Sequence, residues 1–186
     1  MNIRTTLTGL LLLSSLILFT GCAQKTTSGA ATTTTEINKQ VMSHEGEPIL
    51  LGLVDRTGFQ KAPFSGWFNP TYQEYQVRTA DLQGVAENLK DVNIEVFMGT
   101  WCGDSQLEVP QFYKILDHLK FPEKRLKVYA VDNHPDRRKT TPGGEATAKK
   151  IEFVPTFIFI RGGKEIGRIT EYPQKSLEKD MAEYVK

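Results

Sequence analysis

The chain contains very little cysteine: among its 186 residues only Cys22 and Cys102 carry a thiol. Two cysteines cannot supply the disulfide framework that holds many small secreted domains together, so the fold must rest on a hydrophobic core. An excess of charge of one sign is also lacking, because 23 Lys and Arg residues accompany 22 Asp and Glu residues. This balance gives no support for nucleic-acid binding, which needs a basic surface. His44, His118 and His134 have no second ligand at metal-like spacing, so we expect neither zinc nor another cofactor.

A basic start and one apolar run, Leu7 to Phe19, open the chain, and this run is short for a membrane-spanning helix. The run ends in Leu18-Phe19-Thr20-Gly21-Cys22, which resembles a bacterial lipoprotein signal whose cysteine is lipidated. We predict a signal peptide over residues 1–21, then lipidated Cys22 and a flexible Thr/Ser/Ala-rich tether over residues 22–35. The resemblance implies a lipid anchor in the bacterial cell envelope, facing the periplasm, with the outer membrane favoured in a Gram-negative cell. The alternatives are an uncleaved anchor and a plain secretory signal.

Residues 36–79 are predicted to form an N-terminal extension that packs on the main domain. The run Ile49 to Val54 fits either a strand or a short helix, because its apolar periodicity is ambiguous. Six aromatic residues follow, interrupted by prolines and a glycine: Phe59, Phe64, Trp67, Phe68, Tyr72 and Tyr75. Two interpretations of them stay open, an irregular cover packed on the sheet or an aromatic groove that faces the substrate.

Residues 80–186 are predicted to form one domain in which strands and helices alternate. The expected elements are a helix over Asp81–Lys90 with Asp81 as a possible cap, a strand over Ile94–Met98, a helix from Ser105 to Leu119, a strand over Leu126–Val131, a helix over Gly144–Ile151, a hairpin of Thr156–Ile160 and Glu165–Ile169 around Gly162-Gly163, and a last helix over Ser176–Tyr184. This order predicts an α/β protein with a mixed central sheet and helices on both faces.

The stretch Trp101-Cys102-Gly103-Asp104-Ser105 lies where a strand ends and a helix begins. From Leu107 to Leu119 the apolar residues follow the spacing of one helix face, which places Cys102 at the helix N-terminus. Unpaired backbone N–H groups and the helix dipole favour an anion there, and the thiolate is the reactive form of cysteine. Gly103 allows the backbone of a partner to come close, whereas the carboxylate of Asp104 repels a thiolate.

This motif resembles the active site of the thioredoxin superfamily, Trp-Cys-x-x-Cys, which occupies the same place between strand and helix. Pro110 matches the family's helix-kinking proline, and Val154-Pro155-Thr156 resembles the cis-proline segment that faces the reactive sulfur. Over about residues 80–185 the resemblance implies a thioredoxin-like fold. It also implies a set of substrate-binding residues: Trp101, Gly103, Asp104, Val154, Pro155 and Thr156. The chain departs from the family at Ser105, where the second cysteine should be, and at Val96, where many members carry a buried acid.

Because position 105 is serine, Cys102 has no resolving thiol within the mature chain. The Ser105 hydroxyl can donate a hydrogen bond to the Cys102 sulfur, but it cannot release a partner from a mixed disulfide. We therefore expect Cys102 and Ser105 to be the catalytic residues of a membrane-tethered thiol–disulfide exchange protein. Its expected partners are protein thiols and disulfides, or small thiols such as glutathione. Among isomerisation, reduction and deglutathionylation, isomerisation and deglutathionylation fit a single thiol better than net reduction does.

Two other functions are alternatives to this one. The first is a non-catalytic module that binds extended peptides at the Pro155 edge, with Cys102 incidental. The second is an iron–sulfur cluster shared by two subunits, by analogy with single-cysteine glutaredoxins, which Trp101 and Asp104 do not match. The segment from His134 to Lys139 is expected at the same sheet edge as Cys102. It is either a solvated loop or a cationic rim that stabilises the thiolate or attracts glutathione carboxylates.

Overall fold

The computed structural model describes Met1 and residues 36–186. The predicted signal peptide, the lipidated Cys22 and the tether up to residue 35 therefore lie outside residues 36–186. Within this described part, no helix combines the length and the apolar character that a membrane crossing requires.

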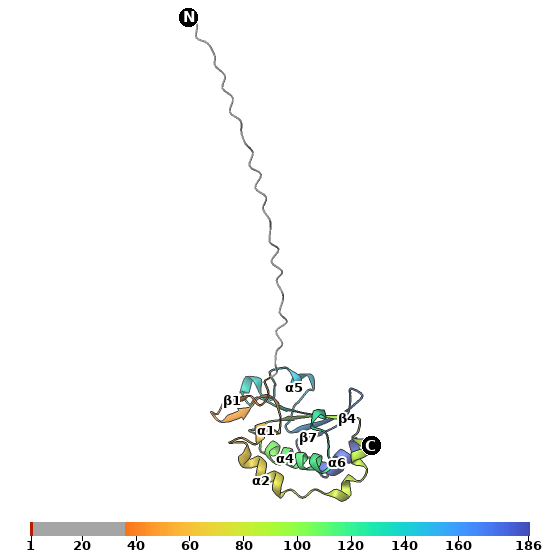
Figure 1. The fold of residues 1–186 in the computed structure, drawn as a ribbon. Coiled ribbons are helices and arrows are strands. Elements are labelled where there is room, and N and C mark those ends of the chain that lie inside the picture. Colours follow the sequence, from red (N-terminus) through yellow and green to blue (C-terminus); the bar gives the residue numbers. More distant parts are fainter. Residues whose placement is uncertain (2–35) are drawn as a thin grey trace. The chain divides into compact units, whose positions relative to one another are not determined.

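Five strands form one mixed sheet in the order β3-β5-β4-β6-β7 (Figure 1). Their bounds are Gly52–Val54 for β3, Val92–Met98 for β4, Leu126–Ala130 for β5, Thr156–Arg161 for β6 and Lys164–Thr170 for β7. Strand β4 lies at the centre, parallel to β5 and antiparallel to β6, so Val96 pairs with both Val128 and Phe157. A separate two-stranded sheet joins β1 (Gln40–Met42) to β2 (Pro48–Leu50).

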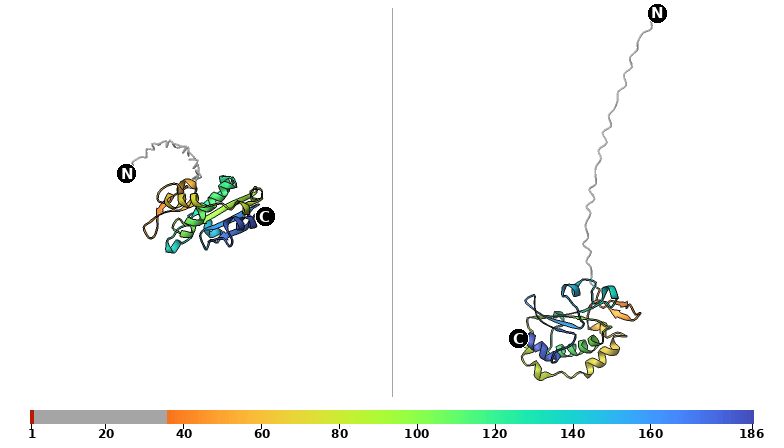
Figure 2. Two further views of the ribbon diagram at one scale, coloured as in Figure 1. Left: turned by 90° about the horizontal axis from the view of Figure 1, so that it is seen from below. Right: turned by 180° about the vertical axis from the view of Figure 1, so that it is seen from behind.

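Helices cover both faces of the five-stranded sheet, as the views in Figures 1 and 2 show. The α-helices are α1 (Arg56–Phe59), α2 (Ser65–Glu74), α3 (Val85–Asn88), α4 (Gly103–His118), α5 (Glu145–Ala148) and α6 (Leu177–Tyr184), and short 3-10 helices span η1 (Thr79–Leu82), η2 (Glu123–Arg125) and η3 (Pro135–Arg137). Successive residues of β4 point to opposite faces. Val96 therefore joins the core beneath α2, α4 and α6, whereas Phe97 joins a smaller core with Ala146 of α5. The prediction of an α/β fold with a mixed, helix-flanked sheet is confirmed.

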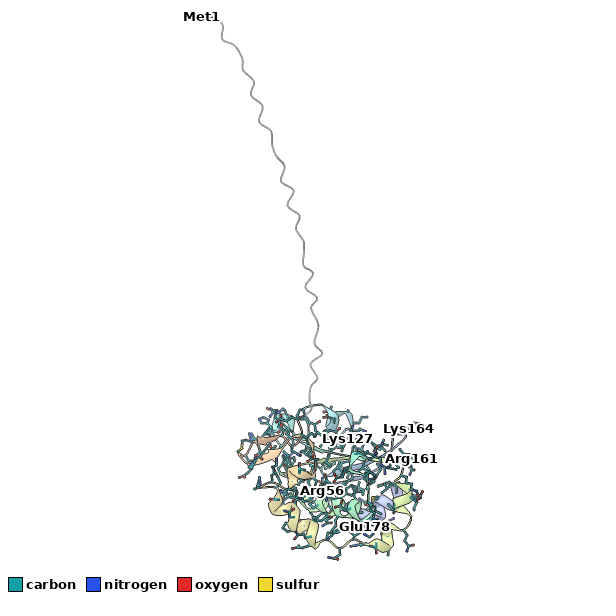
Figure 3. All side chains as sticks on the ribbon, viewed as in Figure 1. Met1, Arg56, Lys127, Arg161, Lys164 and Glu178 are labelled. Carbon is teal, nitrogen blue, oxygen red and sulfur yellow. The ribbon has the colours of Figure 1, made fainter. Side chains whose placement is uncertain are left out.

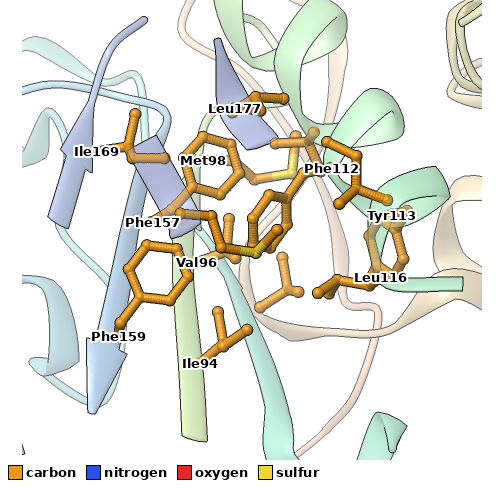
Figure 4. Packing of buried hydrophobic residues seen from close by; sticks show 14 of the residues in the cluster. Ile94, Val96, Met98, Phe112, Tyr113, Leu116, Phe157, Phe159, Ile169 and Leu177 are labelled. Carbon is orange, nitrogen blue, oxygen red and sulfur yellow. The ribbon is translucent and has the colours of Figure 1, made fainter. Parts of the chain in front are cut away.

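The larger core is centred on aromatic contacts between α4 and the sheet. The ring centroids of Phe112 and Phe157 are 4.5 Å apart, and both side chains are almost fully buried. Figure 4 shows these two rings beside Val96 and Phe159, between the strands and α4. This packing fixes α4 against the sheet, and the motif of interest lies between the end of β4 and the start of α4.

The prediction of one continuous helix over Asp81–Lys90 is wrong. The structure has η1 up to Leu82 and a separate helix α3 that begins at Val85. Gly84 between them has φ +77°, a left-handed conformation that interrupts a helix and that glycine adopts without a steric penalty. Asp81 therefore lies within η1 and caps no helix, although Leu82 and Val85 are buried as the apolar pattern indicated.

The extension over residues 36–79 is more regular than the irregular cover that the sequence suggested. The ambiguous run Ile49–Val54 forms two short strands, and the second, β3, is an edge strand of the main sheet. Helices α1 and α2 then pack beside α4, where the ring of Phe68 lies 5.6 Å from that of Tyr113. The extension thus builds part of the domain itself.

An ion pair fixes the extension to α4. Arg56, labelled in Figure 3, donates two hydrogen bonds of 2.6 and 2.7 Å to the carboxylate of Asp117. Its guanidinium also lies 4.7 Å from the ring centroid of Tyr113. This bidentate geometry is the strong form of an arginine–carboxylate pair, and it connects residues 61 positions apart.

Candidate functional site

Cys102 is the N-cap residue of α4, as predicted. Its backbone is extended (φ −95°, ψ 124°), and its side chain makes no capping hydrogen bond. The thiol is therefore left at the end of a sixteen-residue helix, where the dipole favours a negative charge. Cys102 is half-buried, and its Sγ lies 3.3 Å from the carbonyl oxygen of Val154.

Trp101 is fixed by three neighbours. Its indole Nε1 donates a 3.1 Å hydrogen bond to the carbonyl of Val131, at the end of β5. The guanidinium of Arg138 lies 4.5 Å from the indole ring. The ring also crosses Gly99 so closely that a Cβ there would lie 2.6 Å from a ring carbon. Position 99 has room for no side chain, which explains the glycine between β4 and Trp101.

The segment Val154-Pro155-Thr156 faces the thiol and is buried. The Val154–Pro155 peptide bond is cis. The carbonyl of Pro155 accepts a 2.7 Å hydrogen bond from the N–H of Glu171, and the hydroxyl of Thr156 donates one of 2.7 Å to Phe153. The structure therefore brings the backbone of Val154 to the sulfur, while the polar groups of Pro155 and Thr156 are already bonded within the protein.

The prediction of a hydrogen bond from Ser105 to Cys102 is wrong. Ser105 is fully buried under the first turn of α4, and its Oγ accepts a 3.2 Å hydrogen bond from the N–H of Gly99. The only contact of hydrogen-bond type made by the Cys102 sulfur within residues 36–186 is the one to Val154. Gly103 and Asp104 are exposed beside the thiol, so they lie where a docked partner would reach them. Leu107, expected on the apolar face of the helix, is 50% exposed.

Glu108 is a buried acid that the sequence interpretation missed. Its side chain lies on the inner face of α4, one turn after Asp104, and the residue is only 9% exposed. Burial, together with the smaller effect of the negative charges of Asp104 and Glu178, raises the pKa of Glu108 to about 7. The signal was available, because Glu108 lies four residues before Phe112 on the apolar stripe of the helix.

Glu178 of α6, labelled in Figure 3, is the buried neighbour of Glu108. Burial opposes its ionisation. A 3.0 Å hydrogen bond from the Arg78 N–H and one of 2.8 Å from the Tyr75 hydroxyl outweigh that effect, so the pKa of Glu178 is lowered. The two acids therefore titrate in different pH ranges: Glu178 ionises first, and Glu108 keeps its proton to higher pH.

Replacing Glu108 with glutamine should stabilise the protein at pH 8 and change its stability little at pH 4. The folded-state pKa is raised above the ordinary 4.5, so the folded protein binds the proton more tightly than the unfolded chain does. The cost of ionising Glu108 is therefore absent below pH 4.5, grows up to about pH 7 and stays constant above it. With solvent screening, Glu108→Gln should gain about 1–2 kcal/mol at pH 8. Urea denaturation at both pH values measures this, and Glu74→Gln on the exposed end of α2 is the control. An equal change at pH 4 and pH 8 would contradict the assignment.

The basic segment after β5 turns toward Trp101. Arg137 pairs with buried Asp132 at 2.9 Å, and Lys139 donates a short hydrogen bond to the carbonyl of Glu152 and lies over the Phe153 ring. Arg138 is the residue that reaches the active-site loop, through its contact with Trp101. In residues 36–186, no cluster of three His, Cys, Asp or Glu side chains has an arrangement able to hold a metal ion.

Several relatives resemble this chain in sequence. A thioredoxin H-type protein of Picea mariana is 31% identical over 86 residues, which are 46% of this chain and 61% of that protein. Thioredoxin H2-1 of Oryza sativa subsp. japonica is 28% identical over 85 residues, 46% of this chain and 54% of that protein. The chain thus spans less than two thirds of the length of these relatives.

Solved structures and a family model also match this chain. Thioredoxin O2 of Arabidopsis thaliana in its oxidised state has a TM-score of 0.38 at 19% identity, over 57% of this chain and 89% of that one. The thioredoxin of Malassezia sympodialis has a TM-score of 0.36 at 26% identity, over 52% and 76%. The family model described as thioredoxin matches residues 67–185. Since this match covers more than half of the 186 residues, the chain belongs to the thioredoxin family.

Proposed function

We propose that the chain is a thiol–disulfide exchange protein in which Cys102 is the single nucleophile. The observation that carries this proposal is the position of the Cys102 sulfur, at the N-terminus of α4 and 3.3 Å from the Val154 carbonyl. The thiol is half-buried, lies at a helix N-terminus and has a stretch of fixed backbone beside it. Membership of the thioredoxin family supports the same chemistry.

The proposed reaction has two exchange steps. The Cys102 thiolate attacks one sulfur of a substrate disulfide, forms a mixed disulfide and expels the other substrate sulfur as a thiolate. A second thiolate, from the substrate or from a small thiol such as glutathione, then attacks the substrate sulfur of the mixed disulfide and releases Cys102. Each step exchanges one S–S bond for another, so no net oxidant is needed. Ser105 takes no part in the exchange, because its hydroxyl is buried and bonded to Gly99.

We also propose that the protein acts at a membrane of the bacterial cell envelope, through lipid on Cys22. The support is the sequence Leu18-Phe19-Thr20-Gly21-Cys22 at the end of a short apolar run. A tether of about 13 residues has an r.m.s. span of roughly 20 Å, which would keep the domain near the membrane. In a Gram-negative cell, the outer membrane and a periplasm-facing domain fit this arrangement.

Mixed-disulfide formation tests the proposed function. In a Cys22→Ser background, Cys102 is the only thiol, and incubation with an unsymmetrical peptide disulfide should give a one-to-one adduct on Cys102. Added glutathione should then release the peptide and restore the thiol. Cys102→Ala in the same background should form no adduct and should lose disulfide-exchange activity by a factor of about 100 or more.

The outcome of Cys102→Ala also separates the enzyme from a peptide-binding module. A module would keep its peptide affinity and would show no exchange in either protein. Exchange that continued at the original rate after Cys102→Ala would exclude Cys102 as the nucleophile.

A further inference from the structure

The extension and the active-site loop line an open pocket of about 530 Å³ that the proposed chemistry does not use. Residues from the turn after β1 up to α2 form one wall, among them Glu45, Glu47 and Trp67. The loop before α4 forms the other wall through Thr100 and Trp101. These last two residues directly precede Cys102 in the chain. A group bound in this pocket would therefore contact the two residues that precede the reactive cysteine. We refer to it as the extension pocket.

Hydrogen bonds across its walls hold the extension pocket together. The N–H of Leu50 donates a 3.1 Å hydrogen bond to the hydroxyl of Thr100, which is buried. The amide of Asn133 donates a short hydrogen bond to Glu45 and accepts one of 3.3 Å from the N–H of His44. Segments more than 80 positions apart are thus bonded around the pocket, so its shape is set by the fold and not by one loop.

The lining combines aromatic rings with carboxylates. Phe64 is buried, while the half-buried indoles of Trp67 and Trp101 present ring surface to the pocket. The carboxylates of Glu45 and Glu47 stand at exposed positions of the same lining. Arg138 is the one basic residue of the lining, and its guanidinium is already stacked on Trp101. A guanidinium and an indole are thus already in contact at one side of this pocket.

We propose that the extension pocket binds a lysine or arginine side chain of the substrate polypeptide, close in sequence to the cysteine whose disulfide Cys102 attacks. The aliphatic part of such a side chain packs on aromatic surface, and its cationic head reaches Glu45 and Glu47. An aspartate or glutamate side chain would meet two like charges there. This inference rests on the proposed function, since it assigns a substrate class to the same site.

A series of peptide disulfides tests the proposal. The peptides differ at one position, which carries lysine, glutamine or glutamate and is moved from three residues before the reacting cysteine to three residues after it. The measured quantity is the second-order rate constant for adduct formation on Cys102, in the Cys22→Ser protein. At one or more positions lysine should react about 5- to 10-fold faster than glutamine, and glutamate more slowly. The combined variant Glu45→Gln/Glu47→Gln should remove this preference, so that lysine and glutamine peptides react at equal rates.

The control is Glu152→Gln, an exposed carboxylate two residues before Val154, which removes one negative charge outside the pocket. It should leave the preference for lysine intact. Equal rates for lysine and glutamine at every position, or a preference that survives Glu45→Gln/Glu47→Gln, would overturn the proposal. Faster reaction of the glutamate peptides, abolished by Arg138→Gln, would also overturn it and would assign the pocket to anionic ligands. If no peptide forms an adduct with Cys102, it is the proposed function itself that fails.

Discussion

Replacing Ser105 with cysteine should give a protein that reduces one substrate disulfide per molecule without any added thiol. The native protein, reduced and freed of small thiols, should release almost no substrate dithiol and should stay as a mixed disulfide. In the Ser105→Cys protein the introduced thiolate attacks the sulfur of Cys102, which expels the substrate as a dithiol and leaves an internal disulfide. Two electrons pass from the protein dithiol to the substrate disulfide. The yield of substrate dithiol therefore approaches one per protein molecule.

The geometry of the helix start favours this internal disulfide. Side chains three residues apart on a helix have Cβ atoms about 5–6 Å apart, so a small adjustment brings the two sulfurs into disulfide range. The introduced group lies under the first turn of α4, in a site now filled by the fully buried Ser105 hydroxyl. An internal thiol has an effective concentration far above that of an external one, so release should accelerate on the order of 100-fold or more.

Measurement of released substrate thiols in a single turnover distinguishes the two proteins, again in the Cys22→Ser background. Leu107→Cys is the matched control, because it adds a thiol on the same helix at a position that is 50% exposed. That control should resemble the native protein. If the native protein already releases one dithiol per molecule, then a resolving group exists and the single-thiol mechanism is wrong.

The parts of this fold that could be predicted from sequence are those decided by local patterns. The apolar run of β4, the two-glycine turn before β7 and the Ser176 cap of α6 each depend on residues within a few positions, and all three occur in the structure. Cys102 at the N-cap of α4 belongs to this class as well. The helix broken at Gly84 is the exception, because an isolated glycine inside an apolar helical pattern leaves both outcomes open.

The remaining features depend on contacts between distant segments. The sequence places Ser105 three residues after Cys102, which is the spacing of neighbours on a helix. The hydroxyl of Ser105 is nevertheless bonded to the N–H of Gly99, which follows the end of β4. The pairing of β3 with β5 joins segments about 75 positions apart, and short strands carry too little pattern to reveal it. The extension pocket likewise exists only because the fold places Glu45 against Asn133.

Truncation of Phe59 to alanine should destabilise the whole domain by about 3–5 kcal/mol, although Phe59 lies outside the segment that the thioredoxin family model matches. The side chain is fully buried in the aromatic cluster between the extension and α4. Its ring stacks on Phe68 with centroids 5.2 Å apart and lies edge-on to Tyr113 at 6.1 Å. Alanine would leave a cavity the size of a ring in this cluster, and Tyr113 on α4 would lose its packing contact with the Phe59 ring.

Urea denaturation followed by circular dichroism and by tryptophan fluorescence measures this loss. The chain has two tryptophans, Trp67 in the extension and Trp101 in the active-site loop, so fluorescence reports on both parts. Coincident transitions in the native protein and in Phe59→Ala would mean that the extension and the sheet unfold as one cooperative unit.

Phe153→Ala, at a ring that is 44% exposed, is the control and should change stability by no more than about 0.5 kcal/mol. A loss below about 1 kcal/mol in Phe59→Ala, or an early separate transition, would instead make the extension a peripheral attachment. The extension pocket could then not rely on a rigid wall, because Glu45, Glu47 and Trp67 all belong to that segment.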